Sequence, residues 1–387
     1  MNPRRRLFVL VLATLIIIAG CDPRGEPPDP DVEHLNAGAP FQTLWHHYKA
    51  RFVRDGRVLD VDNDGISHSE GQGYGMLLAV AADDRETFDA LKAWTFKHLL
   101  RADGLLAWRF GKCPDEAESA QIAKVMERTP VIEGGECVND PNNASDGEIL
   151  VAWALLRAAQ RWNEPAYLAL ADALAKATVT HSLVDWHGRT LLLPGVEGFV
   201  HDGGGDTPAR LVVNLSYWVF PALDMLAEHF PEQPWAALAA DGQTLIREAR
   251  FGTHDLPPDW LDLDLNSGTW IGPATGFDPV YGFNAVRIPL HLVWGQVRWQ
   301  SDDLAPFMAW WDAREDGRFS AWVDLETGTE ADYDASAGVH AIALVTRALD
   351  AGVSVGAEQW PDFSDHDGYF SWSLALLARV AAQEASR

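Results

Sequence analysis

Apolar residues recur at three- and four-residue spacing along the whole chain, and this helical periodicity limits the possible folds most strongly. The clearest windows are residues 41–53, 86–100, 148–162, 166–178, 235–249, 339–352 and 371–383. With weaker stretches, the pattern predicts about eleven helices joined by short loops. Strands and helices do not alternate as in a parallel-sheet protein, and no fixed repeat indicates a regular solenoid. We therefore expect an all-α toroid of helix hairpins, with short extended segments such as residues 105–110 and 189–200.

The N-terminus reads as an export signal. Three arginines precede an apolar run that is too short to span a membrane and is typical of a secretory signal peptide. Residues 1–20 end in "IAG" before Cys21, like the processing site of bacterial lipoproteins, so we expect a lipid on Cys21. The alternative is an ordinary signal peptide with a chance cysteine. Residues 21–40 are predicted to be a Pro-rich tether, and residues 41–387 a single domain in the periplasm or at the cell surface.

The charge of the chain limits its partners. A formal net charge of −26 repels nucleic acids and anionic lipid headgroups, whereas a neutral ligand is compatible with it. The chain also has 17 tryptophans, and several of them, including Trp108, fall in loops or at element ends. An exposed indole offers a flat apolar face that suits a sugar ring, although a place in the core explains any single tryptophan equally well.

Two cysteines are left once Cys21 is assigned to the lipid. Export places Cys113 and Cys137 in an oxidising space, where an even count favours a disulfide over two free thiols. Closing a loop of this length stabilises a fold by roughly 3 kcal/mol in the loop-entropy estimate.

An acidic loop, "DVDNDGISHSEG", nearly matches a calcium-binding EF-hand. Asp60, Asp62 and Asp64 fit the pattern, but its closing glutamate position falls on Gly71, and Glu70 lies one residue early. The segment before it also reads as strand and turn rather than as a long helix. We therefore expect an acidic turn and no metal site.

Two helix starts carry an acidic residue each. Ser69 with Gln72, and Ser145 with Glu148, have the spacing of capping boxes. This spacing places Glu70 and Asp146 in the first turns of two helices. One interpretation is simple stabilisation of the helix dipole, which favours carboxylates there. The other is chemistry, which requires burial or a like-charged neighbour to raise the pKa of an acid that donates a proton.

The segment "GRVLDVDNDGISHSEGQGYGMLLAVAADD" resembles the first signature of the family 8 glycoside hydrolases, and "ASDGEILVAWALLRAA" resembles the second. This family includes bacterial endoglucanases and the periplasmic cellulases of cellulose-synthesis operons. The resemblance runs from about residue 41 to the C-terminus and implies an (α/α)6 barrel, inversion at the anomeric carbon and no cofactor. It implies further that Glu70 is the general acid and that Asp146 lies at the cleavage site.

Four shorter segments, "LLAWRF", "NLSYWVFPAL", "YGFNAVRIPL" and "DGYFSWSLALLA", resemble substrate-binding parts of the same family. The residues that they imply for substrate binding are Trp108, Asn214, Tyr217, Asn284, Arg287 and Tyr369. The chain departs from the family pattern at Leu215, where a proline is usual, and at Glu148, where an aspartate is usual.

The departure with a chemical consequence is Asn284, because many members have the catalytic base, an aspartate, at this position. An amide cannot take a proton from water at neutral pH. Some relatives with this asparagine place the base in the preceding loop, which here offers the acids Asp259, Asp262, Asp264 and Asp278. We predict Asp278, the nearest in sequence, as the base.

The resemblance thus implies an exported, inverting endo-β-1,4-glucanase that hydrolyses cellulose-like glucan and serves cellulose biosynthesis or exopolysaccharide trimming. Its partners are then a β-linked polysaccharide and the cellulose-synthesis machinery, and its only membrane contact is the lipid anchor. Within the family, xylan, mixed-linkage glucan and chitosan are alternative substrates. Asn284 supports a further alternative, a glycan-binding lipoprotein that has lost catalysis. The acidic loop suggests a calcium-dependent surface protein, which the early position of Glu70 disfavours.

Overall fold

The computed structural model describes residues 35–204, 208–295, 299–313 and 317–385. The expected signal peptide, Cys21 and most of the tether therefore lie outside the described residues. The helices of the described part are α1 (Phe41–Phe52), α2 (Ser69–Ala81), α3 (Arg85–His98), α4 (Glu116–Met126), α5 (Ser145–Trp162), α6 (Pro165–Ser182), α7 (Phe220–His229), α8 (Trp235–Glu248), α9 (Ile288–Trp294), α10 (Ser301–Trp311), α11 (Ala337–Asp350) and α12 (Tyr369–Ala385). Each window predicted from the apolar periodicity lies on one of these helices.

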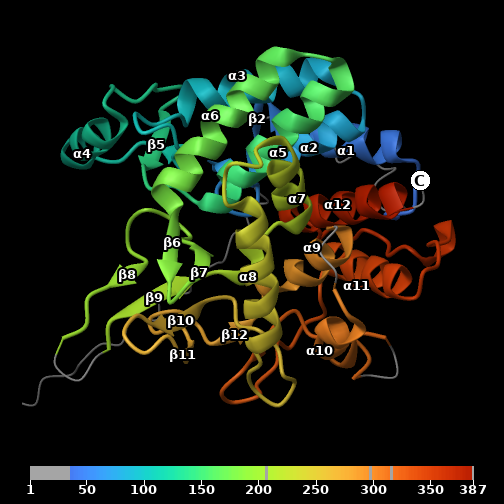
Figure 1. The fold of residues 1–387 in the computed structure, drawn as a ribbon. Coiled ribbons are helices and arrows are strands. Elements are labelled where there is room, and N and C mark those ends of the chain that lie inside the picture. The colour runs from blue at the N-terminus through green and yellow to red at the C-terminus, as the bar shows by residue number, and fades with distance from the viewer. Residues whose placement is uncertain (1–34, 205–207, 296–298, 314–316, 386–387) are drawn as a thin grey trace, which may run out of the picture.

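Six helices contact one another in a closed order, and we call them the inner ring (Figure 1). Along this ring α2 contacts α5, followed by α7, α9, α11 and α12, and α12 contacts α2 again. Further helices pack on the ring from outside, with α3 against α2, α6 against α5, α8 against α7, α10 against α11 and α1 against α12. The apolar residues of both layers form one buried cluster.

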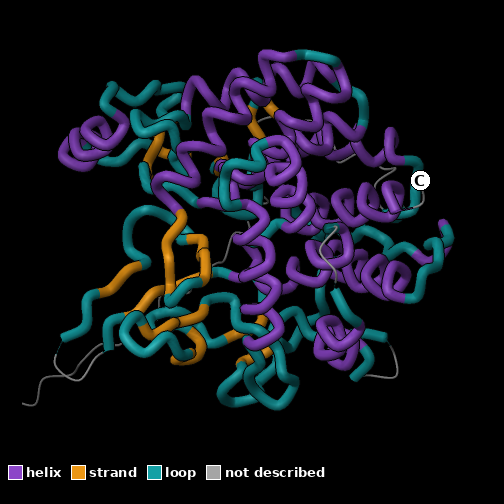
Figure 2. The backbone as a smooth tube through the Cα atoms, viewed as in Figure 1, coloured by secondary structure: helices purple, strands orange, loops and turns teal. Residues whose placement is uncertain are grey.

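The extended segments are more regular than the sequence predicted, so the fold is helix-rich but not strictly all-α. The strands are β1 (Val53–Arg54), β2 (Arg57–Val58), β3 (Ser67–His68), β4 (Arg109–Lys112), β5 (Glu136–Asp140), β6 (Leu183–Trp186), β7 (Arg189–Leu192), β8 (Val200–His201), β9 (Arg210–Val213), β10 (Leu261–Asp264), β11 (Trp270–Pro273), β12 (Val280–Tyr281) and β13 (Val323–Asp324). The largest sheet is antiparallel, in the order β11-β10-β9-β8, and β3-β4-β5 form a second one. Figure 2 shows strands gathered on one side of the molecule, beside the helices.

These sheets lead the chain into the inner ring. Strand β3 runs directly into α2, with Ser67 opposite Phe110 of β4, and β9 runs into the segment before α7. In the larger sheet, Val213 of β9 lies opposite Leu261 of β10, and Arg210 forms an ion pair with the buried Asp262 at 2.8 Å. Such diagonal cross-strand pairs fix the register of a short sheet.

Two further features concern export and anchoring. Cys113 and Cys137 form a disulfide with their Cα atoms 5.1 Å apart, which joins the segment after β4 to β5. Within the parts of the chain that the structure describes, no helix is long and apolar enough to cross a membrane.

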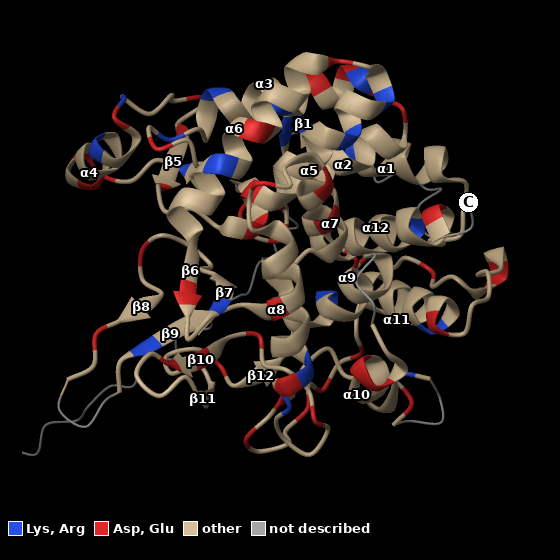
Figure 3. Cartoon of the chain, viewed as in Figure 1, with Lys and Arg blue, Asp and Glu red and all other residues tan. Residues whose placement is uncertain are grey.

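Figure 3 shows acidic positions on helices and loops alike rather than on one element, in keeping with the excess of Asp and Glu.

Candidate active site

The first turn of α2 begins one residue earlier than predicted. His68, not Ser69, is the N-cap, and its Nδ1 accepts a hydrogen bond from the backbone N–H of Gly71 at 3.0 Å. Gln72 does not close a capping box but is buried, where its Oε1 accepts from Val58 and its Nε2 donates to Thr95. The capping box was therefore the wrong interpretation, although Glu70 does lie in the first turn of the helix.

The start of α5 differs from its prediction in the same way. Its N-cap, Ala144, has no side-chain capping bond, and the Ser145 hydroxyl donates to the carbonyl of Leu193 at 2.7 Å. The buried Glu148 accepts from the backbone N–H of Leu106 at 2.8 Å and from Asn143 at 3.1 Å. Glu148 thus ties the segment just before Trp108 to α5, which is a positioning role that the spacing did not reveal.

Two glycines allow the starts of α2 and α5 to approach closely. A Cβ on Gly73 would lie 2.5 Å from the Cβ of Leu150, and a Cβ on Gly147 would lie 2.1 Å from the hydroxyl of Ser69. Neither contact is sterically tolerable, so the glycines of "SEGQG" and "SDG" are needed where the two helices pack. This close packing brings Glu70 and Asp146 to one end of the inner ring.

Arg287, just before α9, binds both acids. Its Nη1 donates to Glu70 Oε1 at 2.6 Å and lies 3.6 Å from Asp146 Oδ2. The same atom donates to the Tyr74 hydroxyl at 3.1 Å, and Nη2 donates to Ser216 at 2.8 Å. The guanidinium is buried, so it holds Glu70 by a charge-assisted hydrogen bond and faces Asp146 as a longer ion pair.

The electrostatics of this cluster favour retention of a proton. Burial, and then the negative charge of Glu70, raise the pKa of Asp146 to about 7, against the lowering effect of Arg287. Asp146 Oδ1 accepts from the backbone N–H of Gly147 at 2.8 Å, whereas its buried Oδ2 has no hydrogen-bond partner. Burial beside a like-charged carboxyl is a typical origin of such a shift.

A hollow of about 160 Å³ opens at these acids. Its lining includes Glu70, Asp146, Trp108 and Tyr217, which the sequence predicted, and also His68 and Asp60, which it did not. The imidazole of His68 lies 3.5 Å from the carboxylate of Asp60. Because His68 Nδ1 accepts from Gly71, its proton is on Nε2, the nitrogen that faces Asp60.

Further predicted binding residues surround the cluster. The buried Tyr369, at the start of α12, lies with its ring 5.5 Å from that of His68. The side-chain amide of Asn214 donates to Asn284 Oδ1 at 2.9 Å, and Arg287 donates to the same oxygen at 2.9 Å. The predicted binding residues therefore lie at the hollow or in the network of contacts that surrounds Glu70 and Asp146.

Asp278, the predicted base, is not brought to this cluster. It is exposed on the loop before β12 and does not line the hollow. The loop acid that touches Asn284 is Asp259, whose Oδ1 accepts from the backbone N–H of Asn284 at 3.2 Å. The loop folds back so that its first acid, not its last, reaches Asn284.

The acidic loop before α2 has structural uses for its side chains. Asp62 Oδ2 accepts from the backbone N–H of Tyr369 at 2.9 Å and so caps the start of α12. Asp60 faces His68, and Asp64 is exposed with a left-handed backbone at φ 55°. The loop therefore joins α2 to α12 by its side chains.

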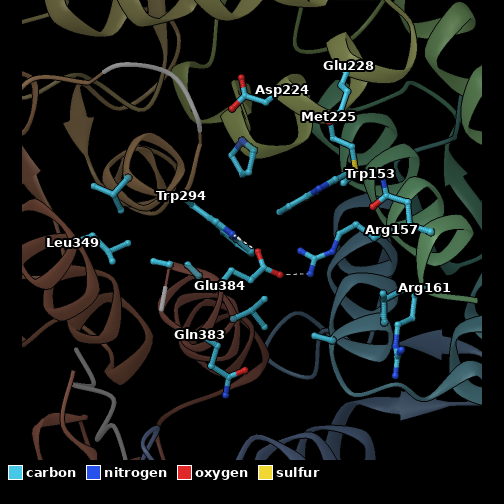
Figure 4. Close-up of a pocket in the computed structure, with 18 of the residues that line it drawn as sticks. Trp153, Arg157, Arg161, Asp224, Met225, Glu228, Trp294, Leu349, Gln383 and Glu384 are labelled. Atoms are coloured by element: carbon cyan, nitrogen blue, oxygen red, sulfur yellow. Dashed lines mark hydrogen bonds and ion pairs between the residues drawn. The ribbon is translucent and has the colours of Figure 1, made fainter. Parts of the chain in front are cut away.

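A larger cavity, of about 1050 Å³, lies at the far ends of the inner-ring helices (Figure 4). Trp153, Arg157, Trp294 and Glu384 line it. Glu384 binds Arg157 and accepts from the indole N–H of Trp294 at 2.8 Å. None of the predicted site residues lines this cavity.

A pair of neighbouring acids at one end of a helix ring, beside aromatic side chains, is a site suited to the cleavage of glycosidic bonds. The family model of glycosyl hydrolases family 8 matches residues 35–384, which confirms the resemblance seen in the motifs. The chain belongs to this family and is a glycoside hydrolase.

Named relatives and a solved structure agree with this assignment. An endoglucanase of Cellulomonas uda is 36% identical over 308 residues, which cover 79% of this chain and 77% of the relative. A probable endoglucanase of Novacetimonas hansenii is 33% identical over 342 residues, or 88% of this chain and 90% of the relative. The crystal structure of endoglucanase Cel10 from Klebsiella pneumoniae aligns with a TM-score of 0.74 at 35% identity, over 89% of this chain and 100% of that one.

Proposed function

We propose that the protein is an inverting endo-β-1,4-glucanase that cleaves cellulose-like glucan. The observation that carries this proposal is the cluster of Glu70, Asp146 and Arg287 at the opening lined by Trp108 and Tyr217. The similarity to enzymes named as endoglucanases supports the same substrate class. The closed order of helix contacts supports an (α/α)6 barrel as the scaffold.

The proposed reaction uses Glu70 as the general acid. Near neutral pH Asp146 retains a proton beside Glu70, and Glu70, which lines the hollow, passes a proton to the glycosidic oxygen as the bond breaks. Asp146 then holds negative charge beside the sugar and stabilises the positive charge that develops on its ring. Trp108 supplies an apolar face for a sugar ring, and the reaction needs no cofactor.

We also propose that the enzyme is exported and held on a membrane surface by a lipid on Cys21. The basic and apolar N-terminus and the "IAGC" sequence support this location. A neutral glucan is compatible with the net charge of −26, and the family's cellulases of cellulose-synthesis operons suggest a role beside that machinery. Mass spectrometry of membrane-extracted protein should find an acylated N-terminal peptide; an unmodified soluble N-terminus contradicts the anchor.

Activity on a polysaccharide panel tests the proposed reaction. We expect release of reducing ends from carboxymethylcellulose and barley mixed-linkage glucan, and little release from xylan or chitosan. Proton NMR of the fresh products should show the α-anomer first, because inversion of a β-linkage yields it. Release mainly from xylan or chitosan would reassign the substrate within the family, and a β-anomer would exclude inversion.

A second candidate function is glycan binding without catalysis, which Asn284 favours because it replaces the usual base. This alternative predicts binding of cello-oligosaccharides by tryptophan fluorescence but no release of reducing ends from any member of the panel. Detectable turnover that Glu70→Gln abolishes excludes it.

A further inference from the structure

Asn284 cannot accept the proton of the attacking water, and this inference rests on the proposed inverting reaction. An amide is not basic at neutral pH, so an inverting enzyme needs a carboxylate elsewhere. The oxygen of Asn284 is also occupied, because Asn214 and Arg287 both donate to it at 2.9 Å. Asn284 can therefore offer a water only the N–H groups of its amide.

The other acids of the preceding loop are engaged elsewhere. Asp262 is fully buried between Arg210, at 2.8 Å, and the backbone N–H of Thr275, at 2.9 Å. Asp264 accepts from two backbone N–H groups of its own turn, those of residues 266 and 267. Asp278 is exposed on the surface of the loop. Asp259 is the remaining acid, and it contacts Asn284 directly.

The two oxygens of Asp259 are in different situations. Oδ1 accepts three backbone N–H groups, from Gly282 at 3.0 Å, Asn284 at 3.2 Å and Ala285 at 2.8 Å. Oδ2 has one contact, with the side-chain amide nitrogen of Asn284 at 3.5 Å, which is at the limit for a direct hydrogen bond. Because this contact is weak, both groups have capacity for a further partner, and one water can bind both of them.

The segment that carries Asp259 lies near the hollow. The ring of its neighbour Trp260 is 6.3 Å from that of Tyr217, which lines the hollow with Glu70 and Asp146. A chain of contacts runs from Glu70 through Arg287 and Asn284 to Asp259. The two carboxylates thus flank the same polar network from opposite ends.

We propose that Asp259 is the general base, and that the water it activates is held between its Oδ2 and the amide of Asn284. The water oxygen forms a bond to the anomeric carbon while the bond from that carbon to the leaving oxygen breaks. The electron pair of the broken bond goes to the leaving oxygen, which takes the proton of Glu70. The water proton goes to Asp259 Oδ2, and solvent restores both acids after release of the product.

The surroundings of Asp259 suit this role. Burial raises the pKa of Asp259, against the lowering effect of the three backbone N–H groups and the Asn284 amide. A raised pKa makes a carboxylate a stronger base, while the backbone donors keep it ionised and in place.

Asp259→Asn is a sharp test because it keeps an oxygen for the three backbone donors and removes only the basic Oδ2. We expect turnover of carboxymethylcellulose to fall about 10²- to 10⁴-fold, with an unchanged thermal midpoint and unchanged binding of cellotetraose. A β-cellooligosaccharyl fluoride separates base from acid, since fluoride leaves without protonation. On this substrate Glu70→Gln should recover activity, whereas Asp259→Asn should not.

A side-chain exchange extends the test even if Asp259→Asn folds poorly. Asp259→Asn with Asn284→Asp moves the carboxylate across the 3.5 Å contact, and we expect it to regain at least a tenth of wild-type turnover. Asp324→Asn, which alters a similar turn-capping acid on another loop, serves as the background control. A folded Asp259→Asn that keeps more than a tenth of wild-type turnover overturns the proposal, as does a large loss in Asp278→Asn alone. An inactive wild-type protein instead refutes the proposed function itself.

Discussion

At the starts of the inner-ring helices the buried Asp146 and the partly buried Glu70 share Arg287, whereas at their far ends Glu384 and Asp83 have one arginine each. The far cavity is several times larger, about 1050 Å³ against about 160 Å³. Each of the two arginines that line it nevertheless has an acid partner, and the indole of Trp294 completes the bonding of Glu384 (Figure 4). The small hollow instead keeps an unsatisfied carboxyl oxygen on Asp146.

This difference teaches that unmatched buried charge identifies the reactive end better than cavity size does. Carboxyls that outnumber their cations in a dry site have shifted pKa values and can exchange a proton with a substrate. Matched pairs near solvent have little to gain from a ligand and mainly support the fold. The same substitution should therefore affect activity very differently at the two ends.

The largest contrast is expected between Glu70→Gln and Glu384→Gln. The first substitution removes the proton donor and should lower kcat on cellulose derivatives about 10²- to 10⁴-fold, with cello-oligosaccharide binding retained. The second makes the same chemical change at the far end and keeps an oxygen for Trp294, so kcat should stay within about twofold. Reducing-sugar kinetics on both purified variants compare them. Similar losses in the two would mean that Glu70 acts through stability rather than chemistry.

Arg287→Lys should have the next largest effect. A lysine keeps the charge but cannot donate to Glu70, Tyr74 and Ser216 at once. Losing hydrogen bonds to charged groups of about 1.5–3 kcal/mol corresponds to roughly a 10- to 100-fold drop in kcat/KM. The matched change, Arg157→Lys, should leave kcat/KM unchanged. If Arg287→Lys were as active as wild type, the several directed N–H donors of the guanidinium would not matter to catalysis.

The pH dependence of activity should show the titration of Asp146. Because its pKa is raised to about 7, Asp146 holds a proton below this pH and loses it above. We expect kcat/KM to fall about tenfold per pH unit above about pH 7.5, as for loss of one essential proton. Through Asp146 the folded state also binds more protons than the unfolded state between about pH 4 and 7. The contribution of Asp146 to the free energy of unfolding should therefore decrease as the pH rises through this window. If kcat/KM did not change up to pH 9, the proton on Asp146 would not be needed for activity.

The smallest effect is expected from breaking the far ion pair. The side chains of Arg157 and Glu384 are 16% and 31% exposed, so water screens their attraction. A double-mutant cycle of Arg157→Gln and Glu384→Gln, read by urea unfolding, should give a coupling of roughly 0.2–1 kcal/mol with activity unchanged. A coupling near zero would mean that the ion pair does not stabilise the fold. A large loss of activity would mean that the far end of the inner ring affects catalysis.

The helices and the two acids at their starts were predictable because both depend on local patterns. Periodicity locates α5 and α12, and the motif around Glu70 assigns the family. The prediction of capping boxes failed because the side chains involved have hydrogen-bond partners that are distant in sequence. Gln72 binds Val58 and Thr95 instead of its own helix start.

Which acid of the loop before Asn284 contacts this asparagine was also unpredictable, because that contact depends on the folded path of the chain. Four acids lie within one loop, and only the folded path of the chain decides which one faces Asn284. Asp259 reaches Asn284 because the backbone between them folds back onto the Asp259 carboxylate, through the N–H groups of Gly282 and Ala285. The sequence nevertheless carried one usable signal, since an asparagine at the base position requires another carboxylate.

The bond from Asp62 to the start of α12 has a consequence for the order of assembly. It joins the first helix of the inner ring to the last, and Tyr369 then lies beside His68 and the first turn of α2. Such contacts, separated by almost the whole chain, form late because the cost of closing so long a loop comes first. A nascent chain therefore has Glu70 early but no finished active site. We therefore expect the enzyme to become competent only after its last helix has packed against α2.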